Sequence, residues 1–483
     1  MALITTFATT PLTAALYPPW YQKKLESWKR GEIDWDGTCL IPDDRHDKDT
    51  ITLEKLQNTQ FSRLLVNLRL DSLPSLLTLI TLFNLNSSSE TTPKVHPLKA
   101  SSIPEESADM TEATPSIRRR SILEVHGVRM LELTERTSSV MKVSEADEYA
   151  VQDPVVNIFR TFGRLNNVAV SGGVAVIPEG SYADTLTNKA SDLSSDLVLI
   201  PWSETGSVND GQGSLLDSTE NRFTSSPHNQ FIATALTKAW CTTAVFVNRG
   251  FGGPSRETER TLNRTVSGLS MRGARDANIS TPIVDRSHHI FFPFFGGADD
   301  RVTLRFVLQL AQNPTVTATI IYFCAPAGTD PTASEAASPP PSRTRTAESI
   351  ENIKSASTIP EPSTAPDKER DMAFFVSLRD SLPSALSSRV VFDILDTTHP
   401  AREALSRAQL EVGASPKNAG DLVIVGKGAH GHFERELSSW VADDVDVVPE
   451  RRKCLGDVAE LMLAMGVKAS VLVIKAAGKG LDV

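Results

Sequence analysis

Short apolar segments alternate with helix-like segments along this chain, and the same order occurs twice. Residues 196–200 (DLVLI) and 421–425 (DLVIV) each combine one aspartate with four apolar residues, and a polar loop, a helix pattern and a short buried strand pattern follow each of them. Such alternation is typical of a parallel sheet with helices on both faces. We therefore predict an α/β fold of two lobes, each a parallel sheet with flanking helices, packed as a pseudo-symmetric pair.

Long polar segments separate the patterned regions. Residues 86–121 and 326–371 are rich in Ser, Thr and Pro and lack apolar periodicity, which is typical of disordered insertions. The first lobe is placed at residues 61–255 and the second at 288–478, with a linker at 256–287. Strands are expected at residues 63–68, 123–133, 168–170, 197–200, 244–247, 289–295, 315–322, 390–394, 421–425 and 470–474, and helices at 71–82, 155–165, 231–238, 299–311, 377–386 and 399–411.

The composition excludes several classes of protein. Hydrophobic residues make up 40% and charged residues 22% of the 483 residues, so the chain as a whole is not disordered or fibrous. Its 49 basic and 59 acidic residues give a net charge of −10. This argues against nucleic acid as the main partner, because phosphate binding needs a basic field. The four cysteines are far apart, which predicts neither a zinc motif nor a disulfide framework and favours a reducing compartment.

The N-terminal segment is unusual. Residues 1–20 carry no charge, and four basic residues follow within residues 21–30. A secretory signal peptide carries its positive charge before the apolar run, and a complete transmembrane helix needs about 20 strongly apolar residues, so neither fits. Two readings stay open from the residues alone. One is the buried N-terminal helix of a soluble protein, and the other is the cytosolic end of a longer transmembrane helix, followed by a membrane-proximal linker at residues 21–60.

Six segments, in the same order along the chain, resemble the plant CHX group of cation/proton exchangers in the cation:proton antiporter-2 family. The fungal K⁺/H⁺ antiporters of this group also resemble residues 1–35, where residues 5–12 (TTFATTPL) look like the end of the last transmembrane helix. The resemblance covers nearly the whole chain except the two insertions, and it favours the transmembrane reading of residues 1–20. The six segments are LELTERTSS at 131–139, DLVLIP at 196–201, VNRGFGG at 247–253, FFGGADDR at 294–301, DLVIVG at 421–426 and LGD at 455–457.

The resemblance implies that this chain is the C-terminal cytosolic region of a fungal K⁺/H⁺ antiporter, which is a membrane protein. The transmembrane domain of the same protein would exchange the ions. This region would form two universal-stress-protein-like lobes that control transport through a nucleotide, pH or phosphorylation. The resemblance also implies a homodimer, and no enzymatic activity is expected of the chain.

A glycine cluster after the strand at 421–425 is the strongest candidate binding site. Gly426, Lys427, Gly428 and Gly431 lie where an α/β sheet usually places its ligands. Glycines let backbone amides approach a phosphate, and the lysine supplies positive charge. We therefore consider an adenine nucleotide as a ligand of the second lobe, although the pattern alone is weak.

The surroundings of this cluster give mixed signals. By the resemblance, Asp299 and Asp300 match a position that contacts an adenine or a ribose. Nucleotide-binding stress proteins carry a later glycine followed by Ser or Thr, whereas here Gly456 is followed by Asp457, whose charge would repel phosphate. The alternative is a tight turn with an aspartate N-cap. The first lobe lacks the glycine pair, and we expect no phosphate site there.

Other motifs carry less weight. Gly172 and Gly173 are expected to form a turn. His288 and His289 are adjacent on a strand, so their side chains point to opposite faces and are not expected to share a metal ion. His430 and His432 lack an evident cysteine or acidic partner, so no metal site is predicted. No Gly-x-Ser-x-Gly elbow is present, so a serine hydrolase is not supported.

A basic run precedes Ser121 in the first insertion. Residues 118–120 are all arginine and Ile122 follows the serine, a pattern that suits a basophilic kinase. A phosphate beside three arginines would order the segment, so Ser121 is a candidate phosphorylation site. The alternative is a solvated basic run without function.

Two other functions compete with control of an antiporter. The first is a soluble tandem stress-type nucleotide-binding protein. The glycine spacing disfavours it, because Val441 stands where such proteins carry their later glycine. The second is an interaction scaffold that uses the two insertions.

Overall fold

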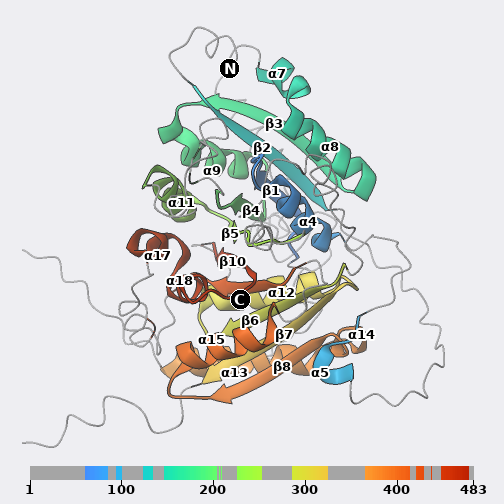
Figure 1. Ribbon diagram of the computed structural model, residues 1–483, viewed down its shortest axis with the longest axis vertical. Coiled ribbons are helices and arrows are strands. Elements are labelled where there is room, and N and C mark those ends of the chain that lie inside the picture. Colours follow the sequence, from blue (N-terminus) through green and yellow to red (C-terminus); the bar gives the residue numbers. More distant parts are fainter. Residues whose placement is uncertain are drawn as a thin grey trace, which may run out of the picture. The chain divides into compact units, whose positions relative to one another are not determined.

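Within the part of the chain that the structure describes, ten strands form one continuous sheet in the computed structural model (Figure 1). The described residues are 60–84, 94–100, 123–133, 146–203, 206, 208, 226–252, 286–324, 365–413, 420–428, 437 and 448–477. The strand order is β3-β2-β1-β4-β5-β10-β9-β6-β7-β8. The strands are β1 (Arg63–Asn67), β2 (Glu124–Glu132), β3 (Ala169–Ile177), β4 (Leu197–Pro201), β5 (Thr242–Val247), β6 (His288–Phe294), β7 (Val316–Cys324), β8 (Val390–Asp396), β9 (Leu422–Gly426) and β10 (Ser470–Lys475).

The two halves of the sheet have the same topology. Counted within each lobe, the strands lie in the order third, second, first, fourth, fifth, and all pairs inside a lobe are parallel. The central strands β4, β5 and β9 are buried along their whole length. Such strands are covered on both faces and read as continuous apolar runs. The predicted α/β class and the pseudo-symmetric pair of lobes are therefore confirmed.

The fifth strands of the two lobes join the halves. β5 pairs with β10 in antiparallel register, and Phe246 lies opposite Leu472. Both side chains are fully buried. We call this β5–β10 pairing the seam. The two lobes therefore pair within one chain, and their backbones share one hydrogen-bonded sheet.

Helices cover both faces of the sheet, and each face has a hydrophobic core that includes residues of both lobes. Across the lobes, Phe61 and Phe306 make an edge-to-face contact at 5.7 Å. Gln309 brackets the backbone of Phe61, accepting from its N–H at 3.0 Å and donating to its carbonyl at 2.9 Å. One core includes α4 (Leu73–Phe83), α8 (Pro154–Asn166), α12 (Ala298–Ala311) and α13 (Ala365–Asp380), and the other includes α9 (Tyr182–Asp192), α11 (Ser226–Lys238), α15 (Pro400–Glu411), α17 (Pro449–Leu455) and α18 (Asp457–Ala464).

Two local predictions were wrong. Gly172 and Gly173 do not form a turn, because both lie inside β3 and pair with Gly127 and Val128 of β2. A Cβ added at Gly172 would lie 2.8 Å from Val156 of α8, so the glycine allows close packing of that helix on the strand. The helix expected at residues 377–386 begins earlier, since α13 covers Ala365–Asp380 and α14 (Ser384–Ser387) follows.

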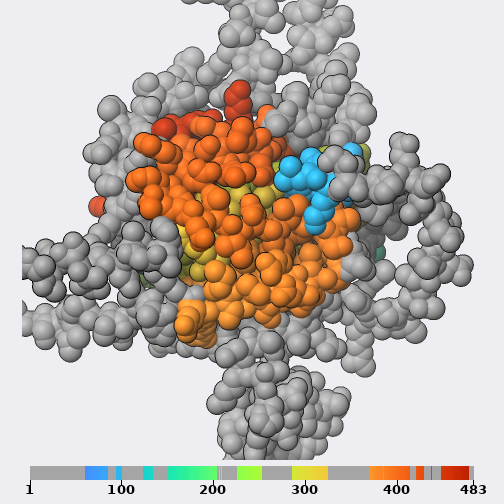
Figure 2. Space-filling model, turned by 90° about the horizontal axis from the view of Figure 1, so that it is seen from below, coloured from blue at the N-terminus to red at the C-terminus, as the bar shows by residue number. Residues whose placement is uncertain are grey.

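Part of the first expected insertion is also ordered. Residues 94–100 belong to the segment for which we predicted disorder, yet they include the short helix α5 (Pro97–Ala100). Backbone N–H groups of Lys94 and His96 donate to carbonyls of Pro314 and Ser388 in the second lobe, at 3.1 and 2.9 Å. Figure 2 shows this segment, in light blue, lying against the orange surface of the second lobe. We call residues 94–100 the strap.

Three of the predicted segments lie wholly or largely outside the described residues. They are the expected membrane end at residues 1–20, the linker at 21–60, of which only residue 60 is described, and the linker between the lobes, of which residues 256–285 are not described. In the described part of the chain, no helix has both the length and the apolar character that a bilayer crossing requires.

Candidate functional site

The predicted glycine cluster lies beside the start of α12. β9 ends at Gly426, and a Cβ there would be 2.2 Å from Oδ1 of Asp300. A Cβ at Gly428 would be 2.8 Å from Oδ2 of Asp299. The fold thus brings together the two glycines and two aspartates that the sequence singled out, and at Gly426 a Cβ would collide with the buried carboxylate of Asp300. Gly431 lies outside the described residues.

Both aspartates bind backbone groups of the second lobe. Oδ2 of Asp300 accepts from the N–H groups of Phe295 and Gly296 at 2.8 and 3.0 Å, and this residue is 1% exposed. Oδ1 of Asp299 accepts from the N–H of Ala476 at 2.8 Å. These carboxylates hold the turn between β6 and α12. Their negative charge beside the glycines opposes the approach of a phosphate.

Lys427 lies between the two glycines. Its backbone N–H donates to the carbonyl of Ile474 in β10 at 2.8 Å. Burial of the side chain lowers the pKa of its ammonium group, and the nearby positive charge of Lys475 lowers it further. Burial and this neighbouring charge therefore both disfavour the charged form on which phosphate attraction depends.

Asp371 of α13 reaches the same turn from the other side. Its Oδ2 accepts from the N–H of Gly297 at 2.9 Å, and its Oδ1 pairs with Arg301. Burial raises the pKa of this carboxyl group, although the bond from Gly297 and the charge of Arg301 act in the opposite direction. The N-terminal turn of α12 thus faces a carboxylate of the same chain.

In the first lobe, Arg69 lies where β1 and β4 end, the equivalent of the ends of β6 and β9 in the second lobe. Arg69, which follows β1, is 4% exposed and donates to Asp71 at 3.0 and 3.1 Å. It also donates to Oγ of Ser203 at 3.0 Å and to the carbonyl of Val208 at 2.6 Å. Asp71, which comes just before α4, thus pairs with Arg69. The Arg69 side chain lies at the strand ends of the first lobe, where we expected no phosphate site.

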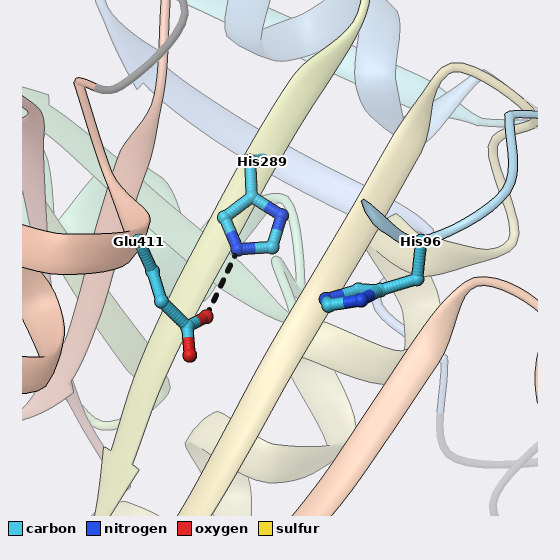
Figure 3. A group of neighbouring side chains, drawn as sticks. All are labelled: His96, His289 and Glu411. Atoms are coloured by element: carbon cyan, nitrogen blue, oxygen red, sulfur yellow. Dashed lines mark hydrogen bonds and ion pairs between the residues drawn. The ribbon is translucent and has the colours of Figure 1, made fainter. Parts of the chain in front are cut away.

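A second polar cluster joins the strap to the second lobe, and the sequence did not predict it. His96 of the strap, His289 of β6 and Glu411 at the end of α15 each offer one ligand atom, and these atoms all lie within 4.8 Å of one another. Figure 3 shows that the two imidazoles and the carboxylate come from separate elements and point toward a common region. We call these three residues the His–His–Glu cluster.

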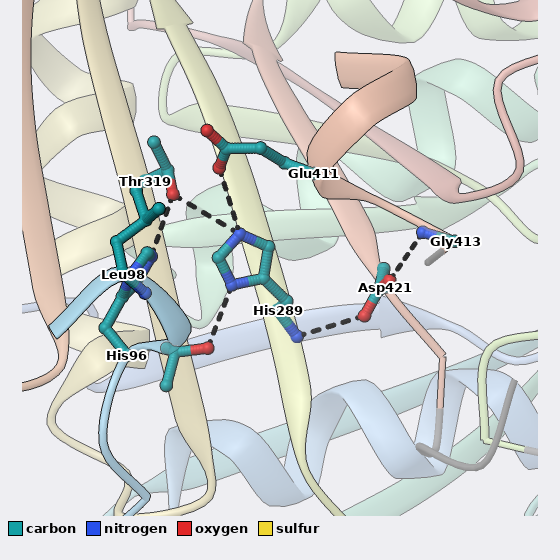
Figure 4. A network of polar contacts seen from close by, with 8 residues as sticks. His96, Leu98, His289, Thr319, Glu411, Gly413 and Asp421 are labelled. Atoms are coloured by element: carbon teal, nitrogen blue, oxygen red, sulfur yellow. Dashed lines mark hydrogen bonds and ion pairs between the residues drawn. The ribbon is translucent and has the colours of Figure 1, made fainter. Parts of the chain in front are cut away.

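Threonine hydroxyl groups of β7 connect the cluster (Figure 4). Nε2 of His96 lies 2.9 Å from Oγ1 of Thr319, which is 3.3 Å from Nε2 of His289. Nε2 of His289 also lies 3.3 Å from Oε2 of Glu411, and its Nδ1 lies 2.9 Å from Oγ1 of Thr317. The cluster is therefore a connected network rather than a chance approach of three side chains.

The cluster's environment sets its protonation at neutral pH. Burial lowers the pKa of His96 to about 4, helped by the charges of His289 and Lys99 and opposed by Glu411. Burial alone would raise the pKa of Glu411, but hydrogen bonds from His289 and Thr319 bring it below its ordinary value. His96 is therefore neutral and Glu411 ionised near pH 7.

The adjacent histidines His288 and His289 of β6 have different partners. Nδ1 of His288 lies 2.8 Å from the carbonyl oxygen of Gly420, and its ring packs on Phe251. His289 points to the other face of the sheet and meets partners from distant segments. The signal available in the sequence was the alternation of Thr317 and Thr319 in an otherwise apolar strand.

Two other expectations cannot be placed on the fold. Ser121 with its preceding arginines, and His430 with His432, lie outside the described residues.

Comparisons with known proteins relate the chain to cation/proton antiporters. Residues 125–251, which run from β2 to just beyond β5, match the plant cation/H(+) antiporter domain. Cation/H(+) antiporter 17 of Arabidopsis thaliana is 23% identical over 44% of this chain and 24% of its own length. Cation/H(+) antiporter 18 of the same plant is 23% identical over 67% of this chain and 31% of its own length. The matches thus span about a quarter to a third of these relatives.

Solved structures include a universal stress protein from Archaeoglobus fulgidus that covers 86% of this chain and 98% of its own, at 8% identity and a TM-score of 0.38. The strand order and the parallel pairing within each lobe by themselves define the α/β fold of the chain.

Proposed function

We propose that this chain is a cytosolic regulatory region of a monovalent cation/proton antiporter, with K⁺ as the transported cation. The observation that carries the proposal is the match of residues 125–251 to the plant cation/H(+) antiporter domain. The alignments with the antiporters leave most of each relative's length unmatched. In this proposal the unmatched portion corresponds to a membrane domain of the same protein, which carries out the exchange.

The shared sheet suggests how regulation would work. A regulatory domain changes transport only when it interacts differently with two states of the transporter. The two lobes share the seam and both hydrophobic cores. Close-packed cores transmit a displacement rather than absorbing it. A signal received by one lobe would therefore reposition the other, and through it the membrane domain.

Three signals remain part of this proposal. An adenine nucleotide would act at the turn formed by Gly426, Lys427 and Gly428, with phosphorylation at Ser121 and pH as the others. A thermal-shift screen with ATP, ADP, AMP and NAD tests the first signal, since ligand at 100 times its Kd adds about 2.7 kcal/mol of stability. A shift that Gly428→Asp abolishes would support a nucleotide. If no nucleotide shifts the melting temperature, phosphorylation or pH would remain as the signal.

We further propose that the antiporter acts as a homodimer.

The direct test is transport by the full-length protein that contains this chain. Membrane vesicles carrying the intact protein are compared with vesicles carrying a version that lacks residues 61–478, at equal amounts in the membrane. We expect K⁺/H⁺ exchange to persist in the shortened protein with an altered pH dependence. Exchange with the same rate and pH profile in both would refute a regulatory role, and a protein without any exchange activity would refute the antiporter assignment.

A further inference from the structure

The His–His–Glu cluster has the donor set of a transition-metal site. Two imidazole nitrogens and one carboxylate oxygen are ligands that Zn²⁺ accepts, with a fourth position left for water. His96 is 1% exposed, and the side chains of His289 and Glu411 are 13% and 18% exposed. The surroundings of the buried His96 hold its ring in place. The partial exposure of His289 and Glu411 leaves a route by which an ion can enter.

The spacing of the donors suits a small cation. In tetrahedral zinc the ligand atoms are about 2.0–2.1 Å from the metal, which places them about 3.3–3.4 Å from one another. Nε2 of His289 and Oε2 of Glu411 are already 3.3 Å apart. The three donor atoms all lie within 4.8 Å of one another. For all three donors to reach one zinc ion, two of the donor atoms must approach each other by about 1.5 Å at most. Movement of the short strap that carries His96 can supply this shift.

The ring of His289 is oriented by a second interaction. Its Nδ1 lies 2.9 Å from the hydroxyl of Thr317. Ligating histidines commonly donate their other ring N–H in this way, which fixes the tautomer and the ring plane. Without a metal, the Nε2–H of His289 donates to Glu411 at 3.3 Å and Nδ1 can accept from the Thr317 hydroxyl. A metal on Nε2 would move the proton to Nδ1, which would then donate to Thr317.

The ring of His96 would have to change its tautomer. The backbone N–H of Leu98 donates to its Nδ1 at 3.2 Å, so in the neutral ring Nε2 carries the proton and faces Thr319. Binding a metal through Nε2 moves that proton to Nδ1 and breaks the bond from Leu98. Leu98 is 65% exposed, so water can take its place. Metal binding is thereby coupled to the conformation of residues 96–98.

We propose that His96, His289 and Glu411 bind a divalent transition-metal ion of the zinc class, which fastens the strap to the sheet of the second lobe. The ligands come from the strap, β6 and α15, so the ion cross-links three segments that are distant in sequence. Lys99 opposes binding of the ion electrostatically, although its ammonium group donates to the carbonyls of Ser387 and Val390. The inference is independent of the proposed transport function.

The test uses the untagged chain of 483 residues, stripped of metal with a chelator and titrated with ZnCl₂ in competition with a chromophoric chelator. We expect one zinc equivalent that His289→Gln and Glu411→Gln each weaken by at least about tenfold. His126→Gln is the matched control, because His126 lies in β2 of the first lobe. Co²⁺ should give the visible absorption of a tetrahedral site in the wild type and in His126→Gln, and lose it in Glu411→Gln.

A second readout separates metal binding from folding. Zinc should slow hydrogen exchange in the strap of the wild type, and it should leave exchange in Glu411→Gln unchanged. This variant keeps the size of the side chain and lies at the partly exposed end of α15, so it preserves the fold. Failure to bind a zinc equivalent, or a zinc equivalent that both ligand variants retain at full affinity, would overturn the proposal.

Discussion

Nε2 of His96 lies 2.9 Å from the hydroxyl oxygen of Thr319, although 223 residues separate them in the sequence. This contact places a segment that follows the first helix of the first lobe on the sheet of the second lobe. The lobes are thus held together by the seam, by the contact of Phe61 with α12, and by the strap.

His96→Ala should release the strap. The substitution removes the bond to Thr319 and leaves a buried hydroxyl group with fewer partners, a change that costs about 1–3 kcal/mol. Hydrogen exchange of the amides of Lys94 and His96, which donate to the second lobe, should become faster. Leu98→Ala is the control, because that side chain is exposed. Equal exchange in the wild type and in His96→Ala would show that the strap is held without the histidine.

The two lobes should unfold as one cooperative unit. Phe375 of α13 is fully buried and contacts Phe294, Tyr322 and Phe392, so Phe375→Ala should cost about 3–5 kcal/mol. Because the cores include residues of both lobes, protection of β1 amides in the first lobe should fall by the same free energy. Hydrogen exchange under mildly denaturing conditions measures both. Protection of β1 that is unaffected by Phe375→Ala would contradict a single unit.

Gly426→Ala should destabilise the protein strongly. The new Cβ would lie 2.2 Å from Oδ1 of Asp300, and overpacking of this kind costs about 1–3 kcal/mol or more. Gly173→Ala is the matched control, because a Cβ there meets nothing within 4 Å. Urea unfolding of both variants measures the difference. Equal midpoints for the two variants would mean that α12 does not pack on β9 as described.

The contribution of Asp371 to stability should depend on pH. Burial raises its pKa in the folded protein above the ordinary value of 3.8. The folded state therefore binds this proton more tightly than the unfolded state, so its contribution is present at low pH and is lost as the pH rises through the raised pKa. The difference in unfolding free energy between the wild type and Asp371→Asn should fall as the pH rises from below 3.8 through the raised pKa. A difference that rises with pH would show that Arg301 dominates over burial.

The sheet could be predicted because its central strands are buried on both faces. In a segment such as 421–425, nearly every side chain must be apolar, and this signal is local. The repeat of that signal then indicated two lobes. Gly172 and Gly173 could not be placed in the same way, because the turn preference of a glycine pair is also local, whereas the contact with Val156 that decides the structure depends on how α8 packs.

Of the two candidate sites, the sequence predicted the turn at Gly426 and Asp300 but not the His–His–Glu cluster. Gly426 and Asp300 each follow a predicted strand of one lobe, and parallel strands bring their ends to the same edge of the sheet. The position of the His–His–Glu cluster does not follow from the arrangement of parallel strands. His96 lies in a polar segment without periodicity, and its partners become neighbours only when the strap crosses to the second lobe.

The most direct test of the proposed regulation is K⁺/H⁺ exchange by the full-length protein with its seam disrupted. Leu472→Arg places a charge at a fully buried position opposite Phe246, whereas Leu165→Arg makes the same change at a side chain that is 80% exposed. If the paired lobes regulate transport, Leu472→Arg should shift the pH dependence of exchange in the same direction as removal of the lobes, and Leu165→Arg should leave it unchanged. Identical pH profiles for the wild type and Leu472→Arg would contradict a regulatory role of the paired lobes.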